Sequence, residues 1–210
     1  VIEDHPLSIE LGDWVIDTAL QQISHWQRQG LTLQVSVNVG AQQLQQPKFA
    51  ARLAQQLAQH PDVAADLLEL EIVETSALKD IAEVAELMRE CRALGVHFAV
   101  DDFGTGYSSL TYLKRLPAGL LKIDQTFVRD MLDDPDDLEI VKGIIGLAKA
   151  FHRKVIAEGV ETITHGELLI PLGCELAQGY GIARPMPAAE LPEWAANWKP
   201  HSRWTALYPL

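Results

Sequence analysis

Two adjacent acids, Asp101 and Asp102, follow the apolar run 98–100 and precede a loop with glycines at alternate positions, Gly104 and Gly106. The apolar run predicts a buried strand that ends at the acids. Two close carboxylates repel each other unless a cation shares their charge, so we interpret the pair as ligands of a divalent metal. The alternative is an Asp-initiated turn in which glycine supplies positive φ, and it is the better account of such a motif in isolation.

The rest of the chain favours the metal, because polar residues recur where other apolar runs end. Glu71 stands inside an apolar segment, and a buried carboxylate needs a partner. Lys122 stands in another such segment, where it either extends to water or faces anions. The full set of polar residues near predicted strand ends is Asn38, Glu71, Asp101, Lys122, Glu158 and Gln178.

Predicted strands and helices alternate along the chain, which is typical of βα units around a parallel sheet. Strands are expected over 33–39, 67–72, 98–102, 120–124, 155–161 and 174–180. Helices are expected over 7–29, 48–60, 79–94, 138–152 and 163–172, with a short helical piece at 110–113. We assign the apolar face of the first helix to Leu11, Trp14, Val15, Thr18, Ile23 and Trp26. In a (β/α)₈ barrel the strand ends meet at one mouth, where such enzymes keep their chemistry.

Composition fits one domain over residues 1–210, with a closing helix and tail over 188–210. A net charge of -12 argues against binding to DNA or RNA, and no apolar run approaches the roughly 20 residues of a membrane span. Cys91 and Cys174 lack metal-ligand spacing and predict reduced thiols in a cytoplasmic protein. Because a barrel has eight strands, we expect the opening strands to be missing from this chain.

Six segments together resemble the EAL-domain family, the bacterial phosphodiesterases that linearise cyclic di-GMP. The resemblance runs from about Ile2 to Pro187. Its segments are S-V-N-V at 36–39, L-E-L-E-I-V-E at 68–74, D-D-F-G-T-G-Y-S-S-L at 101–110, L-K-I-D at 121–124, A-E-G-V-E-T at 157–162 and Q-G-Y at 178–180. The resemblance implies a TIM-like (β/α)₈ barrel and a cyclic di-GMP phosphodiesterase with two Mg²⁺ or Mn²⁺ ions.

The resemblance also implies roles for particular residues. Lys122 matches the lysine that contacts the attacking water, which it either holds or deprotonates, and Gln178 matches a residue near that water. Glu74 and Glu161 match acids that support the active-site loop. The matching metal ligands are Asn38, Glu71, Asp101, Asp102 and Glu158. The loop that couples metal binding to dimerisation matches Phe103, Gly104, Thr105, Gly106, Tyr107 and Ser108, and it implies a homodimer.

The oxygen atoms of Asn, Asp and Glu suit Mg²⁺ or Mn²⁺ better than zinc, and paired divalent ions serve phosphodiester hydrolysis directly.

The Glu-Ala-Leu signature of the family is not in this sequence, and Gly40 stands where the family commonly has Ser. We therefore expect a domain truncated at its N-terminus and impaired in catalysis, cut from a parent with an upstream sensor or diguanylate-cyclase-like domain and compatible with a membrane anchor elsewhere.

Two alternatives to the phosphodiesterase stay open at this point. The first is a catalytically inactive receptor that binds cyclic di-GMP and signals by conformation. The second is enolase-type barrel chemistry, which also places metal-binding acids and a lysine base at strand ends. Enolase-type chemistry explains the strand ends but not the glycine loop at 103–110.

Overall fold

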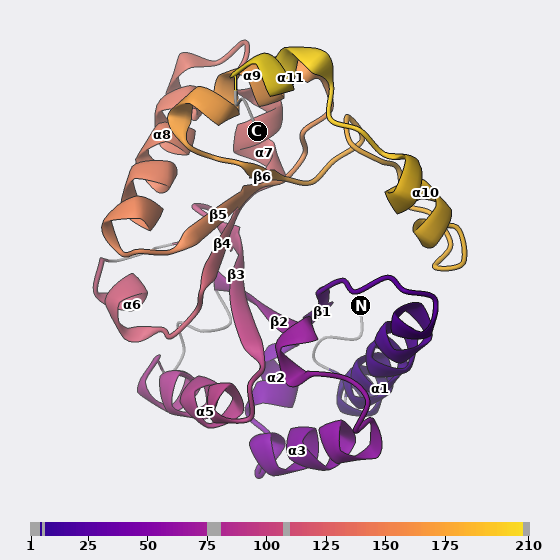
Figure 1. The fold of residues 1–210 in the computed structure, drawn as a ribbon. Coiled ribbons are helices and arrows are strands. Elements are labelled where there is room, and N and C mark those ends of the chain that lie inside the picture. Colours follow the sequence, from indigo (N-terminus) through magenta and orange to yellow (C-terminus); the bar gives the residue numbers. More distant parts are fainter. Residues whose placement is uncertain (1–4, 6, 75–80, 107–109, 208–210) are drawn as a thin grey trace. The chain divides into compact units, whose positions relative to one another are not determined.

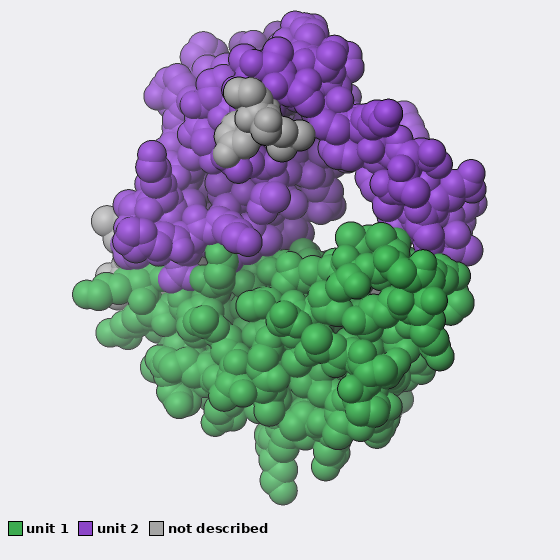
Figure 2. Space-filling model, viewed as in Figure 1, with its two compact units in different colours: residues 1–100, 108–119 green, residues 101–107, 120–210 purple. Residues whose placement is uncertain are grey.

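The computed structural model describes residue 5 and residues 7–74, 81–106 and 110–207 (Figure 1). The chain divides into two compact units, one of residues 1–100 and 108–119 and the other of residues 101–107 and 120–210 (Figure 2). The division falls inside a strand, between Val100 and Asp101. The paired acids therefore begin the second unit.

Within the described residues, six strands follow one another through the sheet in sequence order. The pairs β1–β2, β4–β5 and β5–β6 are parallel. The strands are β1 Val35–Asn38, β2 Leu68–Val73, β3 His97–Phe103, β4 Leu120–Ile123, β5 Lys154–Ala157 and β6 Leu176–Ala177. The predicted α/β fold is confirmed, and six strands in this order agree with part of a TIM-like barrel.

In the first unit, helix α1 packs on β1 and on two further helices, α2 and α3. Helix α5 in turn contacts α3 and α6. The bounds are α1 Leu7–Arg28, α2 Ala41–Leu44, α3 Phe49–Gln59, a 3₁₀ turn at Ala65–Leu67, α5 Ile81–Ala93 and α6 Leu110–Arg115. The short α2 was not predicted, and the predicted start of α5 at Lys79 lies outside the described residues.

The predicted apolar face of α1 is wrong over its first half. Leu11 and Trp14 are 42% and 62% exposed, whereas Ile16 and Leu20 are completely buried. Both stripes have helical spacing, so the sequence pattern fits either of them. Packing against β1, α2 and α3 selects the stripe that contains Ile16, Leu20 and Ile23.

Strand β2 is buried on both of its faces. Leu70 and Ile72 are completely buried on one face, and Glu69 and Glu71 are only 6% exposed on the other. Ser36 Oγ of β1 donates a hydrogen bond of 2.9 Å to Glu69 Oε1. Strand β2 therefore carries two acids in the interior of the first unit.

In the second unit, α7 packs against α8, which lies along β4 and β5, and α11 packs against α9. The helix bounds are α7 Gln125–Asp130, α8 Pro135–Ala150, α9 Ile163–Leu172, α10 Leu191–Asn197 and α11 Ser202–Leu207. The helix predicted to begin at 138 begins at Pro135, because Asp134 caps it. The predicted closing helix and tail are two short helices, α10 and α11.

The C-terminal helix α11 packs closely on α9 because Gly166 has no side chain. A Cβ atom on Gly166 of α9 would lie 2.4 Å from Trp204 Nε1. The same indole nitrogen donates a hydrogen bond of 2.8 Å to the backbone oxygen of Ile163. Close approach at Gly166 thus lets Trp204 pack against the first turn of α9.

Both cysteines are free and buried. Burial raises the pKa of the Cys91 thiol to about 12 and that of Cys174 to about 11. At neutral pH both are therefore unreactive thiols. Across the described part of the chain, every helix is too short or too polar to cross a bilayer.

Candidate active site

At the strand ends of the first unit, Asn38 and Glu71 stand side by side. They are register partners in the parallel pair β1–β2, and the backbone N–H of Val39 donates a hydrogen bond of 2.8 Å to the carbonyl of Glu71. Glu71 is buried and Asn38 is exposed. Glu74, which follows β2, is completely buried.

In the second unit, Lys122 lies between two carboxylates. Its Nζ is 2.9 Å from Asp101 Oδ1 and 2.8 Å from Glu158 Oε1. The Lys122 side chain is only 6% exposed, so it does not extend to water. Of the two alternatives left open for Lys122, the structure shows that it faces anions, and two short ion pairs fix its ammonium group.

Three carboxylates in the second unit converge on one point. Asp101, Asp102 and Glu158 each offer an oxygen, and these oxygens lie within 4.8 Å of one another. Burial, followed by the charge of Asp101 and a hydrogen bond with Asp124, raises the pKa of the Asp102 carboxyl. Hard oxygen ligands crowded in this way fit Mg²⁺ or Mn²⁺, whose positive charge would offset the repulsion.

Consecutive residues of a strand normally face opposite sides, yet Asp101 and Asp102 serve one cluster. The backbone of Asp102 explains this, because its φ of 52° is in the left-handed region that Asp tolerates better than most residues. Thr105 holds the turn, with its N–H 3.3 Å and its Oγ1 2.9 Å from the carbonyl oxygen of Asp102. The strand therefore ends in a turn that brings the second acid back to the first.

The start of the glycine loop is packed against the helices of its own unit. Phe103 is buried, and Gly104 has a φ of 107°. A Cβ atom on Gly104 would lie 2.9 Å from Ile144 Cδ1 and 3.0 Å from Phe127 Cε2. Thr105 is exposed, Gly106 is partly exposed, and the predicted loop residues Tyr107 and Ser108 lie outside the described residues.

The segment after Glu158 places the remaining predicted residues. The Glu158 N–H donates a hydrogen bond of 3.2 Å to the carbonyl of Ile123. Gln178 is bonded through its backbone to Ala157 at 2.8 Å and to Val160 at 3.0 Å. The side chains of Gln178 and Glu161 are exposed. Of the predicted residues in this unit, the ones brought into contact are Asp101, Asp102, Lys122 and Glu158.

Sequence reasoning did not single out one buried acid near the cluster. Asp124 is 8% exposed, and its carboxylate caps α7 by accepting hydrogen bonds from the N–H and Oγ1 of Thr126. Its negative charge is one of the causes that raise the pKa of the Asp102 carboxyl. Two features of the sequence could have pointed to Asp124. Asp is preferred at helix N-caps, and residues two apart along a strand face the same side, so Asp124 is expected on the same side as Lys122.

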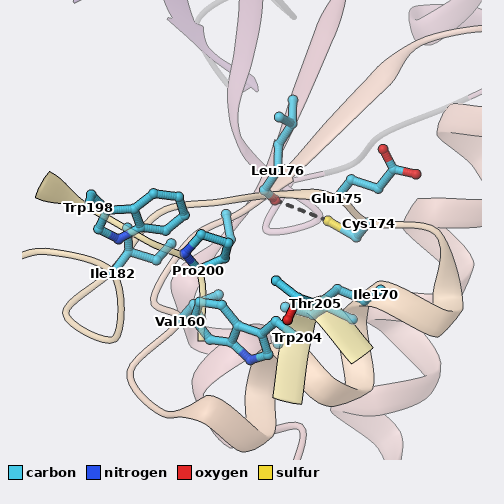
Figure 3. Close-up of a pocket in the computed structure, with 13 residues that line it drawn as sticks. Val160, Ile170, Cys174, Glu175, Leu176, Ile182, Trp198, Pro200, Trp204 and Thr205 are labelled. Carbon is cyan, nitrogen blue, oxygen red and sulfur yellow. Dashed lines mark hydrogen bonds between the residues drawn. The ribbon is translucent and has the colours of Figure 1, made fainter. Parts of the chain in front are cut away.

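A cavity of about 430 Å³ elsewhere in the second unit has a different character (Figure 3). Its wall includes the side chains of Leu176, Trp198 and Trp204. The Cys174 thiol donates to the Leu176 carbonyl at 3.3 Å, and Trp204 Nε1 donates to Ile163. These wall donors are bonded within the protein, and no cluster acid lines the cavity. The candidate active site is therefore the acid cluster.

The fold and the cluster define a class, the α/β barrel proteins that carry charged groups at the ends of parallel strands. The EAL domain model matches residues 1–185, and the chain belongs to the EAL domain family.

Two Pseudomonas aeruginosa proteins are similar to this chain. The cyclic di-GMP phosphodiesterase PA2567 is 39% identical over 88% of the chain and 31% of its own length. The bifunctional diguanylate cyclase/cyclic di-GMP phosphodiesterase MucR is 39% identical over 88% of the chain and 27% of its own length. The chain thus spans less than a third of either relative.

Among solved structures, the PaMucR phosphodiesterase in complex with c-di-GMP superposes with a TM-score of 0.86 at 39% identity. The match covers 90% of this chain and 77% of that one. The EAL domain of Mycobacterium smegmatis DcpA gives a TM-score of 0.84 at 36% identity. Both structures support the partial barrel described above.

Proposed function

We propose that this chain provides the catalytic machinery for metal-dependent hydrolysis of cyclic di-GMP to linear pGpG. The observation that carries the proposal is the buried Lys122, held 2.9 Å from Asp101 and 2.8 Å from Glu158 beside a third acid, Asp102. The names of the relatives and the c-di-GMP complex of PaMucR support the choice of substrate.

The residues divide the work by their chemistry. Asp101, Asp102 and Glu158 would hold Mg²⁺ or Mn²⁺, which neutralises phosphate charge and supplies hydroxide near neutral pH. Lys122 is a fixed positive charge, because its two carboxylate partners limit the rotation of the ammonium group. Its role is to orient the attacking water and the phosphate oxygens.

Several further roles belong to the same proposal. In the first unit, Asn38 and Glu71 offer oxygens of the type that holds Mg²⁺ or Mn²⁺, and we propose them as ligands. Gln178 would lie near the attacking water, and Glu74 and Glu161 would support the active-site loop. The loop beginning at Phe103 would couple metal binding to formation of a homodimer.

The test is a cleavage assay with cyclic di-GMP and Mn²⁺ or Mg²⁺, in which linear pGpG is measured by chromatography. Because the relatives are longer than this chain, the assay includes residues 1–210 and a version extended upstream, and we expect more turnover from the longer version. Asp101→Asn should abolish cleavage. Asp130→Asn is the matched control, because Asp130 is an exposed acid paired with Arg129 at 2.8 Å.

The same assay separates hydrolysis from binding alone. If the extended protein binds cyclic di-GMP in calorimetry but forms no pGpG with either ion, the chain is a receptor and the proposal fails. If Asp101→Asn and Asp130→Asn cleave at the wild-type rate, the acid cluster is not the site.

A further inference from the structure

A buried histidine, His165 in the first turn of α9, has hydrogen-bond partners on both of its ring nitrogens. The side chain belongs to a residue that is only 4% exposed. Its Nδ1 lies 3.3 Å from the backbone nitrogen and 2.7 Å from Oγ1 of Thr162, and its Nε2 lies 3.2 Å from the backbone oxygen of Arg129. Because a carbonyl oxygen can only accept, Nε2 carries the proton, and Nδ1 accepts from the Thr162 N–H.

The two bonds of His165 have different reach. Thr162 is the N-cap of α9, and His165 stands three residues later, where a capping box has Glu or Gln. The bond to Thr162 is therefore local to α9. Arg129 lies in the last turn of α7, 36 residues away in the sequence. The bond to Arg129 thus ties the start of α9 to the end of α7.

The segment between β5 and α9, residues 158–162, carries Glu158 of the acid cluster. Its turn packs on the other end of α7, because Gly159 has a φ of 72° and a Cβ atom there would lie 2.8 Å from Gln125 Cβ. Gln125 is the first residue of α7. The segment is therefore held along α7 at two places, by the close approach of Gly159 and by the bond from His165.

Helix α7 is itself fixed to the strand that carries Lys122. Strand β4 ends at Ile123, and α7 begins at Gln125. Whatever fixes the segment 158–162 on α7 therefore also fixes Glu158 relative to Lys122, to which it is paired at 2.8 Å.

We propose that His165 is a positioning residue, whose bond to the Arg129 carbonyl holds the segment 158–162 on α7 and so keeps Glu158 in place beside Lys122. The inference rests on the proposed function in so far as this ion pair serves catalysis. A displacement of about 1 Å, caused far from the reacting atoms, can lower a rate about 10²-fold.

Two substitutions separate the tie to α7 from the local cap. In His165→Asn the amide oxygen can replace Nδ1 as the acceptor for Thr162, but the side chain is too short to reach Arg129. His165→Gln restores the usual capping-box residue, and its amide nitrogen is long enough to replace Nε2 as the donor to Arg129. Both variants lose the imidazole ring, but only His165→Asn loses the tie.

The experiment measures hydrogen exchange by NMR at the amides of Glu158 and Val160, which donate to backbone carbonyls, together with kcat for cyclic di-GMP. In His165→Asn exchange should be about 3–10-fold faster, as expected for the loss of one hydrogen bond, and kcat should fall about 10–100-fold. His165→Gln should stay within about threefold of wild type in both measurements. His60→Asn is the matched control, because His60 ties α3 to Asp17 of α1 at 2.8 Å in the first unit, and it should leave both measurements unchanged.

Wild-type exchange and wild-type kcat in His165→Asn would overturn the proposal, and so would equal losses in His165→Asn and His165→Gln. If His165→Asn does not fold, the ¹H–¹⁵N spectrum of the wild-type ring decides. It should show a proton on Nε2 that is protected from exchange, and a proton on Nδ1 instead would overturn the proposal. Faster exchange in His165→Asn alone, in a protein whose wild type does not cleave cyclic di-GMP, would support the positioning role and contradict only the proposed function.

Discussion

The second unit contains two regions of opposite character. Around Lys122 the side chains are charged and nearly buried, with ion pairs of 2.8 and 2.9 Å. Around Trp204 there is a cavity of about 430 Å³ whose wall donors are bonded to the backbone of the same unit. Burying charge is costly unless the charge is compensated, whereas an apolar cavity requires no such arrangement.

The comparison shows that the volume of a cavity is a poor guide to the position of the active site in this unit. A cluster that keeps three acids and a lysine together must be held by the surrounding fold, and perturbed acids such as Asp102 concentrate at functional sites. The cavity instead marks where α11 and the segment before it pack onto α9. The two regions should therefore respond differently to mutation, one in activity and the other in stability.

After Asp101→Asn, the largest loss of activity is expected from Lys122→Met. Loss of one preorganised donor at the reacting group typically lowers kcat by about 10²–10³-fold, so pGpG formation should fall by that factor. Lys142→Met is the matched control, because Lys142 forms an exposed pair with Glu139 at 2.7 Å. Retention of more than a tenth of the wild-type rate in Lys122→Met would exclude Lys122 from the mechanism.

The next largest effect is the stabilisation of the folded protein by a bound metal ion. Mn²⁺ at a hundred times its dissociation constant should raise the free energy of unfolding by about 2.7 kcal/mol, and Asp101→Asn should greatly reduce this gain. Urea unfolding with Mn²⁺ and with EDTA measures it, and Asp130→Asn should keep the full gain. An equal gain in Asp101→Asn would place the ion elsewhere.

The cavity is tested by Trp204→Ala. A fully buried Trp→Ala change costs about 3–5 kcal/mol, and because Trp204 is only half-buried we expect about 2 kcal/mol of lost stability. Cleavage per folded molecule should stay within about twofold of wild type. Trp198→Ala, at a residue 40% exposed on the same wall, should cost less. A rate loss in Trp204→Ala that matches Lys122→Met would erase the distinction between the regions.

The smallest effect is a pH dependence of the metal-free protein. The pKa of Asp102 in the folded protein is raised above 3.8, so folding favours its protonated form. This contribution to stability is present below about pH 4 and is lost as the pH rises through the folded pKa. Asp102→Asn mimics the protonated acid and should gain stability relative to wild type as pH increases. If the stabilities of wild type and Asp102→Asn, measured in EDTA from pH 4 to 7, changed in parallel, this expectation would be wrong.

The sequence predicted the alternating fold and the polar strand ends well, because both follow from local patterns. Runs such as 67–72 and 120–124 are too apolar to lie outside a sheet, and a lysine or acid within them needs a partner. These patterns predict Lys122, Asp101 and Glu158 as site residues, and the structure brings the three into contact.

What the sequence could not predict depends on tertiary packing. Helix α7 has only six residues, too few for a periodic pattern, so the cap at Asp124 was overlooked. The turn at Asp102 needs Thr105 and the contacts of Gly104 with α7 and α8. The two apolar stripes of α1 are equivalent in spacing, and only the neighbouring elements decide between them.

The two buried thiols also have a practical consequence. Because Cys91 and Cys174 are inaccessible and have pKa values of about 12 and about 11, maleimide reagents should leave them unmodified near neutral pH. A single cysteine introduced at an exposed site such as Lys114 would then carry the only label. The native chain is thus ready for site-directed fluorescence or spin-label spectroscopy, without prior removal of either cysteine.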